Sequence, residues 1–201
     1  MKTFNEICNE CGTDKGSIHL VDGQNHGHDY ARHYERFFAP LRASEIKLLE
    51  IGVGGGQSIR AWLEYFSNAQ VFGVDIASDT NVWDRPGKQD RYTFVKGDQS
   101  DEIFWKSFIV EHGGLWDIVI DDGGHMANQI ITSYNQLWPE VKAGGFYCIE
   151  DLGVSYTNSA LFVPAGSQNH MDFLKARVDD INQQPGIDTV YFARELSIIK
   201  K

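Results

Sequence analysis

The chain has 201 residues, with 18 Lys and Arg against 28 Asp and Glu, and its formal net charge is −10 at pH 7. A chain of this length can bury one continuous core, so residues 1–201 are expected to form a single domain. The negative charge disfavours nucleic acids and anionic membranes as partners. No apolar run approaches the ~20 residues that span a bilayer. The first residues also lack the apolar core of a secretion signal, so the sequence predicts a cytoplasmic protein.

Three cysteines are too few for a disulfide framework. Cys8 and Cys11 form a single CxxC motif, and a structural zinc ion would need two further ligands at a suitable spacing. The nearby histidines His26, His28 and His33 do not complete a known finger pattern. The sequence therefore favours two reduced thiols over a zinc site.

Residues 1–42 differ in composition from the rest of the chain. The stretch CGTDKGSIHLVDGQNHGH (11–28) is rich in glycine and histidine and has no apolar period. Residues 29–41 follow with a helical pattern, whose apolar face is formed by Tyr30, Tyr34, Phe37, Phe38 and Leu41. Two interpretations are open: an irregular lead-in tied down by a helix, or a flap that carries binding groups over the site.

Short apolar runs alternate with helical patterns through residues 43–201. Strands are predicted over 46–52, 69–75, 92–98, 115–122 and 145–151, with helices over 58–66, 102–112 and 126–138. A helix over 170–182 and an antiparallel strand pair over 188–201 are predicted to close the chain. This alternation is typical of βαβ units, so we expect an α/β, Rossmann-like core with a mostly parallel seven-stranded sheet and helices on both faces.

A glycine-rich loop, LLEIGVGGGQS (48–58), follows the first predicted strand and opens a helix. Its spacing is Gly52-x-Gly54-x-Gly56, and Gln57 stands where the dinucleotide fingerprint requires glycine, which weakens an NAD interpretation. No Lys-Ser or Lys-Thr pair directly follows this loop, as a Walker A motif would require. Asp75 ends the second predicted strand, where a carboxylate can accept hydrogen bonds from a ribose diol.

The pattern ExGxGxG, from Glu50 to Gly56, resembles the first motif of class I S-adenosylmethionine-dependent methyltransferases. This resemblance implies S-adenosylmethionine as the cofactor, bound along Gly52, Gly54 and Gly56. It also implies a place for three polar residues near the nucleoside: Asp75 at the ribose, and Asp98 with Gln99 near the adenine.

Three carboxylates follow the fourth and fifth predicted strands: Asp122, Glu150 and Asp151. Neighbouring parallel strands would bring them to the same edge of the sheet, where like charges repel unless a cation lies among them. Oxygen ligands suit Mg²⁺. The sequence therefore predicts a magnesium site formed by these three residues.

His125 lies three residues beyond Asp122, on a glycine-flanked turn before a predicted helix. A neutral imidazole in that place can take the proton from a hydroxyl held at the metal. A histidine hydrogen-bonded to backbone at a helix start is the structural alternative. Because three carboxylates are expected to converge beside it, we favour His125 as the catalytic base.

Several segments together resemble the mycinamicin-type, metal-dependent sugar O-methyltransferases. The resemblance lies in GTDKGS (12–17), the helix with Tyr30 and Tyr34, and the segments LEIGVGGGQS, IDDGGH and IEDL. It implies an Mg²⁺-dependent O-methyltransferase that uses S-adenosylmethionine, with ligands Asp122, Glu150 and Asp151 and base His125. Catechol-type enzymes carry a lysine at the base position, so histidine favours a sugar hydroxyl as the acceptor.

The expected partner is therefore a small sugar or glycoside, with assembly into a homo-oligomer left open. Two other functions compete with this one. A non-catalytic cofactor- or sugar-binding protein could be built on the same fold, because fold does not determine function. An NAD-dependent oxidoreductase is disfavoured by Gln57 and by the clustered acids.

Overall fold

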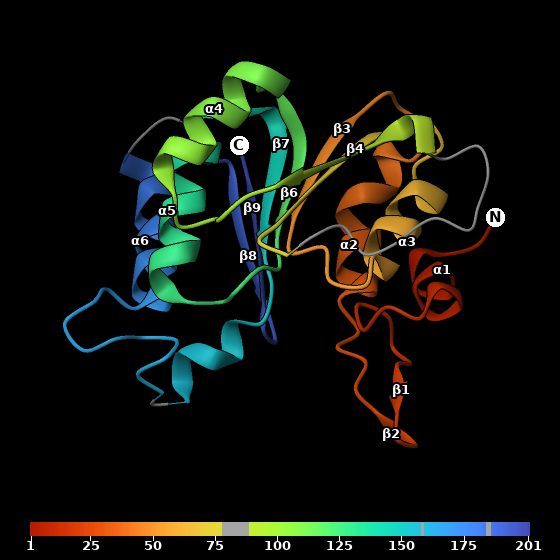
Figure 1. Ribbon diagram of the computed structural model, residues 1–201, viewed down its shortest axis with the longest axis horizontal. Helices are drawn as coiled ribbons and strands as arrows, with labels where there is room; N and C mark the ends of the chain where they lie inside the picture. Colours follow the sequence, from red (N-terminus) through yellow and green to blue (C-terminus); the bar gives the residue numbers. More distant parts are fainter. Residues whose placement is uncertain (78–88, 158, 184–185) are drawn as a thin grey trace.

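A seven-stranded sheet with the strand order β5-β4-β3-β6-β7-β9-β8 forms the centre of the computed structural model, which describes residues 1–77, 89–157, 159–183 and 186–201 (Figure 1). The strands are β3 Lys47–Ile51, β4 Gln70–Asp75, β5 Tyr92–Lys96, β6 Trp116–Asp121, β7 Val141–Ile149, β8 Thr189–Ala193 and β9 Leu196–Lys200. The strands β3 to β7 run parallel, whereas β9 is antiparallel to both β7 and β8. The predicted α/β, Rossmann-like fold with its closing antiparallel pair is confirmed.

Helices cover both faces of this sheet (Figure 1). The helices on one face are α1 Phe4–Cys11, α2 Ala31–Phe38 and α3 Gln57–Tyr65, and those on the other are α4 Glu102–His112, α5 Ala127–Leu137 and α6 His170–Gln183. Short 3₁₀ segments are η1 Ala39–Leu41, η2 Gln89–Arg91, η3 Trp138–Glu140 and η4 Leu152–Tyr156. None of the helices within the described residues is long and apolar enough to cross a membrane.

Successive residues of the central strands belong to two separate hydrophobic clusters. Leu48 and Ile118 pack with the α1–α3 side, whereas Leu49 and Val119 pack with the α4–α6 side. Side chains alternate between the faces of a strand, so a strand covered on both faces must be apolar throughout. This is why the strand sequences lack the alternation of a half-exposed sheet.

The first helix, α1, was not predicted, although the sequence carries a local signal for it. The Thr3 hydroxyl accepts the Glu6 backbone N–H, while the Glu6 carboxylate accepts the Thr3 N–H, which forms a capping box. Gly12 ends the helix with φ of 74°. The ring of Phe4 stacks on Trp62 of α3 at 4.3 Å, so α1 is anchored to the body of the protein.

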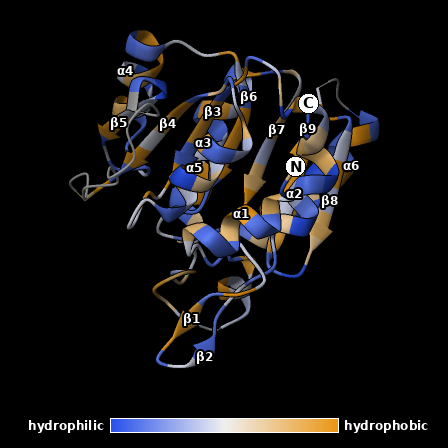
Figure 2. Cartoon of the chain, turned by 90° about the vertical axis from the view of Figure 1, so that its right-hand side faces the viewer, coloured by the Kyte–Doolittle hydropathy of each residue, from blue (hydrophilic) through white to orange (hydrophobic). Residues whose placement is uncertain are grey.

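A small hairpin, β1 Leu20–Val21 with β2 Gln24–Asn25, extends away from the sheet (Figure 2). Its turn consists of Asp22 and Gly23, both at positive φ (49° and 78°), as the tight turns of two-residue hairpins require. The segment 11–28, which the sequence left without regular structure, thus contains one short ordered hairpin. Helix α2 follows and buries Tyr34 and Phe38.

His170, the first residue of α6, is buried and makes a hydrogen bond through Nε2 with the Ser155 hydroxyl. Burial, with a smaller contribution from the charge of His125, lowers the pKa of His170 from 6.5 to about 4. The unfolded chain therefore takes up a proton at this histidine at a higher pH than the folded protein does. Above pH 6.5 the protonation of His170 does not change the free energy of unfolding. As the pH falls from 6.5 towards 4, this group lowers the free energy of unfolding.

Between about pH 7 and about pH 4.5, we expect the free energy of unfolding of the wild type to fall by about 2–3 kcal/mol more than that of His170→Gln. Glutamine keeps a group that can hydrogen-bond Ser155 but does not titrate. Urea unfolding at a series of pH values measures the difference. His26→Gln, at an exposed site, is the control. If the free energy of unfolding of His170→Gln falls as steeply at acid pH as that of the wild type, other groups cause the acid sensitivity.

Candidate active site

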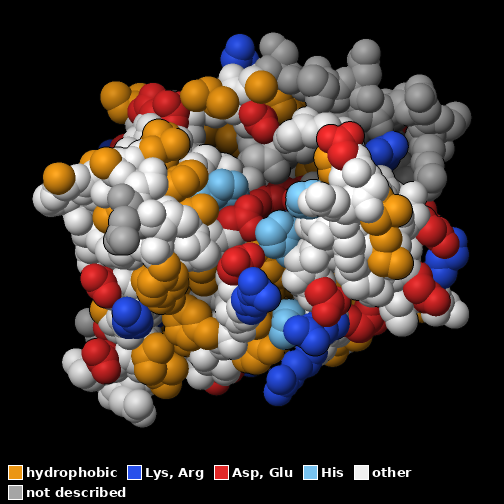
Figure 3. Space-filling model, turned by 90° about the horizontal axis from the view of Figure 1, so that it is seen from below, with side chains coloured by type: hydrophobic (Ala, Val, Ile, Leu, Met, Phe, Trp, Pro, Cys, Tyr) orange, Lys and Arg blue, Asp and Glu red, His pale blue; other side chains and the backbone are white. Residues whose placement is uncertain are grey.

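Acidic residues gather where β6 and β7 end, at the carboxyl edge of the parallel strands. The Asp122 N–H donates to the Ile51 carbonyl, and the Glu150 N–H donates to the Asp121 carbonyl, so both residues lie one step beyond paired strands. Asp151 follows Glu150 directly. Seen from below, acidic and histidine side chains gather in a hollow of the surface (Figure 3). The structure thus brings the three predicted metal ligands to one edge.

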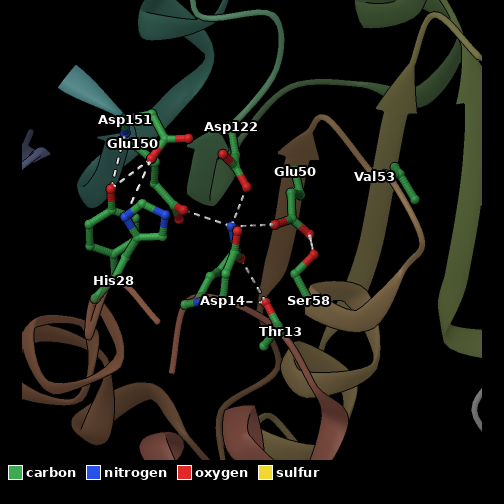
Figure 4. Close-up of polar contacts among 12 residues, drawn as sticks. Thr13, Asp14, His28, Glu50, Val53, Ser58, Asp122, Glu150 and Asp151 are labelled. Carbon is green, nitrogen blue, oxygen red and sulfur yellow. Dashed lines mark hydrogen bonds and ion pairs between the residues drawn. The ribbon is translucent and has the colours of Figure 1, made fainter. Parts of the chain in front are cut away.

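A buried lysine, to which no sequence motif assigns a role, lies among these acids. The Lys15 ammonium donates to Asp122 and, at 2.7 Å, to Glu150, and it lies 3.4 Å from Glu50. Its side chain is only 1% exposed. Figure 4 shows the carboxylates of Glu50, Asp122 and Glu150 pointing toward one another. A positive charge among the clustered acids is therefore supplied by the chain itself.

The acids around Lys15 are perturbed by their burial. Burial raises the pKa of Glu50 to about 7, although the Lys15 ammonium acts in the opposite direction. Burial likewise raises the pKa of Glu150 well above its ordinary range, again opposed by Lys15. One ammonium group cannot balance two buried carboxylates and the partly buried Asp122, so the cluster still favours further positive charge or a proton.

Asp151 faces a different set of partners. The Tyr30 hydroxyl donates to its Oδ1 at 2.8 Å, and His125 Nε2 lies 3.4 Å from its Oδ2. Asp122, His125 and Asp151 each offer one ligand atom, and these three atoms lie within 4.8 Å of one another. Glu150 lies beside this group, but its Oε1 accepts the Tyr34 hydroxyl at 2.6 Å and its Oε2 accepts Lys15.

A second cluster shares Asp151 with the first. The His28 Nδ1 lies 3.3 Å from Glu195 Oε2 and 3.9 Å from Asp151 Oδ1, and the His28 ring stacks on Tyr30. Glu195 comes from the turn between β8 and β9. No motif marked it in the sequence. The acidic edge is thus completed by the N-terminal segment on one side and by the C-terminal strand pair on the other.

Three residues at this edge adopt left-handed backbone conformations without being glycine: His125 (φ 57°), Asp151 (φ 56°) and Glu195 (φ 60°). Such conformations are uncommon and carry an energetic cost, and they cluster at functional sites. His125 lies before the first turn of α5, which begins at Ala127. Its imidazole is consequently placed by the turn and not by the helix.

A cavity of about 480 Å³ adjoins the acids. The predicted cofactor residues that line it are Gly52, Gly54, Asp75, Asp98 and Gln99, together with Asp122 and the N-terminal residues Gly12 to Lys15. A Cβ at Gly52 would come within 2.0 Å of the Asp122 carbonyl oxygen, so only glycine allows the loop to approach that strand end. Gly56 does not line the cavity. It precedes α3 with φ of 75°.

Two of the polar residues in the wall are held by hydrogen bonds. Asp75 Oδ2 accepts the backbone N–H groups of Val53 and Gly54 at 2.8 and 3.1 Å. Burial alone would raise the pKa of Asp75, but the backbone N–H groups outweigh it and hold the pKa below its usual value. Gln99 donates to the buried Asp121 at 3.0 Å, so it also ties the cavity wall to β6.

Neither N-terminal cysteine forms a disulfide bond, and Cys8 is buried. Neither belongs to a cluster of metal-binding side chains within the described part of the chain. Burial raises the pKa of the Cys8 thiol, which keeps it protonated and unreactive.

The strand order, the glycine loop and the acidic edge together define a Rossmann-like protein of the class I methyltransferase type. Residues 49–152, just over half of the chain, match the model of a family described as a methyltransferase domain, and the chain belongs to this family. The N-terminal segment that supplies Lys15, His28, Tyr30 and Tyr34 lies outside the matched residues.

The chain is also similar to curated proteins whose names state an activity. The chain is 31% identical over 207 residues to the 8-demethyl-8-(2-methoxy-alpha-L-rhamnosyl)-tetracenomycin-C 3'-O-methyltransferase of Streptomyces olivaceus, a match that covers 91% of this chain and 52% of that protein. It is 38% identical over 136 residues to the mycinamicin VI 2''-O-methyltransferase of Micromonospora griseorubida, covering 64% of this chain and 33% of the relative. These matches confirm the resemblance to sugar O-methyltransferases.

The MycE methyltransferase from the mycinamycin biosynthetic pathway, solved with Mg, SAH and mycinamycin VI, superimposes with a TM-score of 0.82. The identity is 29%, and the match covers 100% of this chain and 53% of that one. The chain thus spans about half, or less, of the length of the relatives it matches.

Proposed function

We propose that the protein is an S-adenosylmethionine-dependent, Mg²⁺-dependent O-methyltransferase that acts on a hydroxyl of a sugar or a glycosylated small molecule. One observation carries the proposal: Asp122 borders the glycine-loop cavity and also belongs to the cluster with His125 and Asp151. A methyl donor in the cavity and an acceptor at the acids would therefore meet at the same strand end. The relatives that methylate sugar hydroxyls support the choice of acceptor.

The residues around the cavity fit S-adenosylmethionine, which would supply the methyl group. A Cβ at Gly54 would meet no described atom within 4 Å, so this part of the loop leaves space beside the cavity. Asp75 accepts backbone N–H groups of Val53, Gly54 and Ala77, which hold its carboxylate in the cavity wall, where we place the ribose hydroxyls. Asp98 lies further along the wall, where we place the adenine with Gln99.

The acids fit a divalent ion. The ligand atoms of Asp122, His125 and Asp151 lie within 4.8 Å of one another, and Glu150 is not in that set. We assign Asp122, Glu150 and Asp151 as the ligands because hard cations prefer oxygen, with Glu150 sharing the oxygens that accept Tyr34 and Lys15. A bound Mg²⁺ would supply positive charge that makes a nearby hydroxyl more acidic.

His125 is proposed to accept the proton of the acceptor hydroxyl. Its side chain is about one quarter exposed, and it stands beside Asp151 at the border of the acids. Asp151 can orient the imidazole through the 3.4 Å contact and can stabilise the imidazolium that forms. The chain's own contribution is then to hold the base and both reactants in one geometry.

The acceptor would enter between the N-terminal segment and the turn before β9. His28 and Glu195 present hydrogen-bonding groups there, which suits a hydroxylated ligand. We also propose that the polar loop 153–170 forms a wall of the acceptor site. Residue 158 of this loop lies outside the described residues. We propose that residues 1–42 act as flap and helix on a 43–201 core within one domain, and that homo-oligomers are compatible with this arrangement. The free thiols fit a reducing compartment such as the cytoplasm.

Calorimetric titration with S-adenosylhomocysteine and with NAD, each with and without Mg²⁺, tests the cofactor. Methyl transfer is then assayed with mycinamicin VI and with rhamnosylated tetracenomycin, the kinds of acceptor that the relatives' names specify. We expect S-adenosylhomocysteine to bind and NAD not to bind. Cofactor binding without turnover of any glycoside would favour a non-catalytic binding protein, and binding of NAD alone would favour an oxidoreductase.

Asp75→Ala is expected to weaken S-adenosylhomocysteine binding by about 1.5–3 kcal/mol, roughly 10- to 100-fold, because hydrogen bonds to a charged group are lost. Calorimetry measures the affinity, and the melting temperature is recorded on the same sample because Asp75 also supports the loop. Asp188→Ala, an exposed carboxylate paired with Lys200, is the control. Unchanged affinity in a folded Asp75→Ala protein would remove Asp75 from the binding site.

A further inference from the structure

The N-terminal segment places one buried ammonium group against two of the proposed metal ligands. Lys15 donates to Asp122 and to Glu150, at 2.7 Å in the second case, and it also lies 3.4 Å from Glu50. Its side chain and those of Glu50 and Glu150 are almost fully buried. A buried ion pair of this kind is a weak source of net stability, because desolvation offsets much of the attraction. Its presence therefore calls for another explanation.

The position of Lys15 is determined by its own backbone. The carbonyl of Lys15 accepts the Ala31 N–H at 2.9 Å, at the start of α2, and the carbonyls of Asp14 and Gly16 accept the N–H groups of His28 and Asp29. Helix α2 is in turn anchored in the core. The backbone of Lys15 is thus held in place, and its ammonium group lies among Glu50, Asp122 and Glu150.

The same contacts decide which way the carboxylates turn. Glu150 is held between the Tyr34 hydroxyl at 2.6 Å and the Lys15 ammonium, so both of its oxygens are oriented. Asp122 is tied to Lys15 through Oδ2 and still offers a ligand atom to the group with His125 and Asp151. Flexible carboxylates bind a small, strictly octahedral ion poorly unless they are preorganised.

We propose that Lys15 is a positioning residue for the divalent-ion site, an inference that rests on the proposed function. Its ammonium group holds the carboxylates of Asp122 and Glu150 in the orientation in which they meet the ion. It acts through those carboxylates and touches neither the ion nor the acceptor. The alternative is that Lys15 only offsets buried negative charge.

A charge-balanced double variant separates these two roles. Lys15→Met combined with Glu50→Gln removes one positive and one negative charge from the cluster, and Glu50 is not a proposed metal ligand. We expect this protein to recover most of the melting temperature that Lys15→Met alone loses, yet to bind Mn²⁺ at least tenfold more weakly than the wild type. Mn²⁺ binding is followed by the loss of the electron paramagnetic resonance signal of the free ion. Wild-type Mn²⁺ affinity in the double variant would overturn the proposal.

Lys15→Arg gives an independent test, since it keeps the charge and changes the shape of the cation. We expect it too to weaken Mn²⁺ binding, whereas a pure counter-charge would leave the affinity unchanged and so contradict the proposal. Lys142→Met, which removes a half-exposed lysine paired with Asp117, is the matched control and should bind Mn²⁺ as the wild type does. If the wild type itself binds no Mn²⁺, the metal-dependent function fails. If the wild type binds Mn²⁺ and the Lys15 variants bind it with the same affinity, the positioning role is refuted while the metal-dependent function stands.

Discussion

Replacing His125 by alanine is expected to lower kcat by about 10²–10⁴-fold, the usual range for the loss of a positioned general base. His125 Nε2 lies 3.4 Å from Asp151 Oδ2, and His125 belongs to the cluster with Asp122, which lines the cofactor cavity. Steady-state kinetics at saturating cofactor and acceptor measure the effect.

Two controls decide what such a loss would mean. His112→Ala removes a histidine that packs on Phe72 and Phe108 at the far side of the sheet, so it should lower the melting temperature without a comparable loss of kcat. Mn²⁺ affinity, measured on His125→Ala, separates a base from a ligand: a base leaves it nearly unchanged, whereas a lost ligand weakens it. A variant with wild-type kcat would place the base elsewhere, and His28 would be the next residue to examine.

Removing divalent ions is expected to abolish methyl transfer, and Mg²⁺ should restore it. The physical reason is that the clustered acids at the ends of β6 and β7 would otherwise repel one another and the ionising hydroxyl. S-adenosylhomocysteine affinity should largely survive chelation, because the residues proposed to hold the cofactor, Gly52, Gly54 and Asp75, line the cavity and are not proposed metal ligands. Activity is measured after exhaustive treatment with EDTA and after titration back with Mg²⁺.

Asp122→Asn provides the matched test, since it removes one proposed ligand while keeping its size. It should require much more Mg²⁺ for half-maximal activity. Refilling with Ca²⁺, which prefers a larger and more irregular oxygen cage, should restore less activity than Mg²⁺. Full activity in the chelated enzyme would end the metal mechanism and leave the carboxylates with a structural role.

The sheet and its acidic edge could be predicted from the sequence because their signals are local. Each strand is a short apolar run next to a turn, and parallel strands align their carboxyl ends without further information. Asp122, Glu150 and Asp151 could therefore be placed together before any coordinates were known. Helix α1 also had a local signal, the capping box of Thr3 and Glu6, which the CxxC motif obscured.

The interior of the candidate site could not be predicted in the same way. Lys15 meets Asp122 across 107 positions of sequence and Glu150 across 135, and no local pattern encodes such a pairing. The predicted repulsion among the acids was sound physics, but it assumed that only a metal could relieve it. Gly56 is a smaller difference between prediction and structure. The motif places it in the cofactor loop, whereas in the structure it is the N-cap of α3.

The left-handed backbone at His125, Asp151 and Glu195 has a consequence for engineering and for evolution. Glycine would adopt each of these conformations at lower cost, by roughly 1 kcal/mol per position. Selection for thermal tolerance alone would therefore reward the replacement of residues that the proposed chemistry needs. Glycine at His125 or Asp151 would relax the backbone but would remove a side chain that the proposed chemistry uses, so stability and activity would be opposed at this edge.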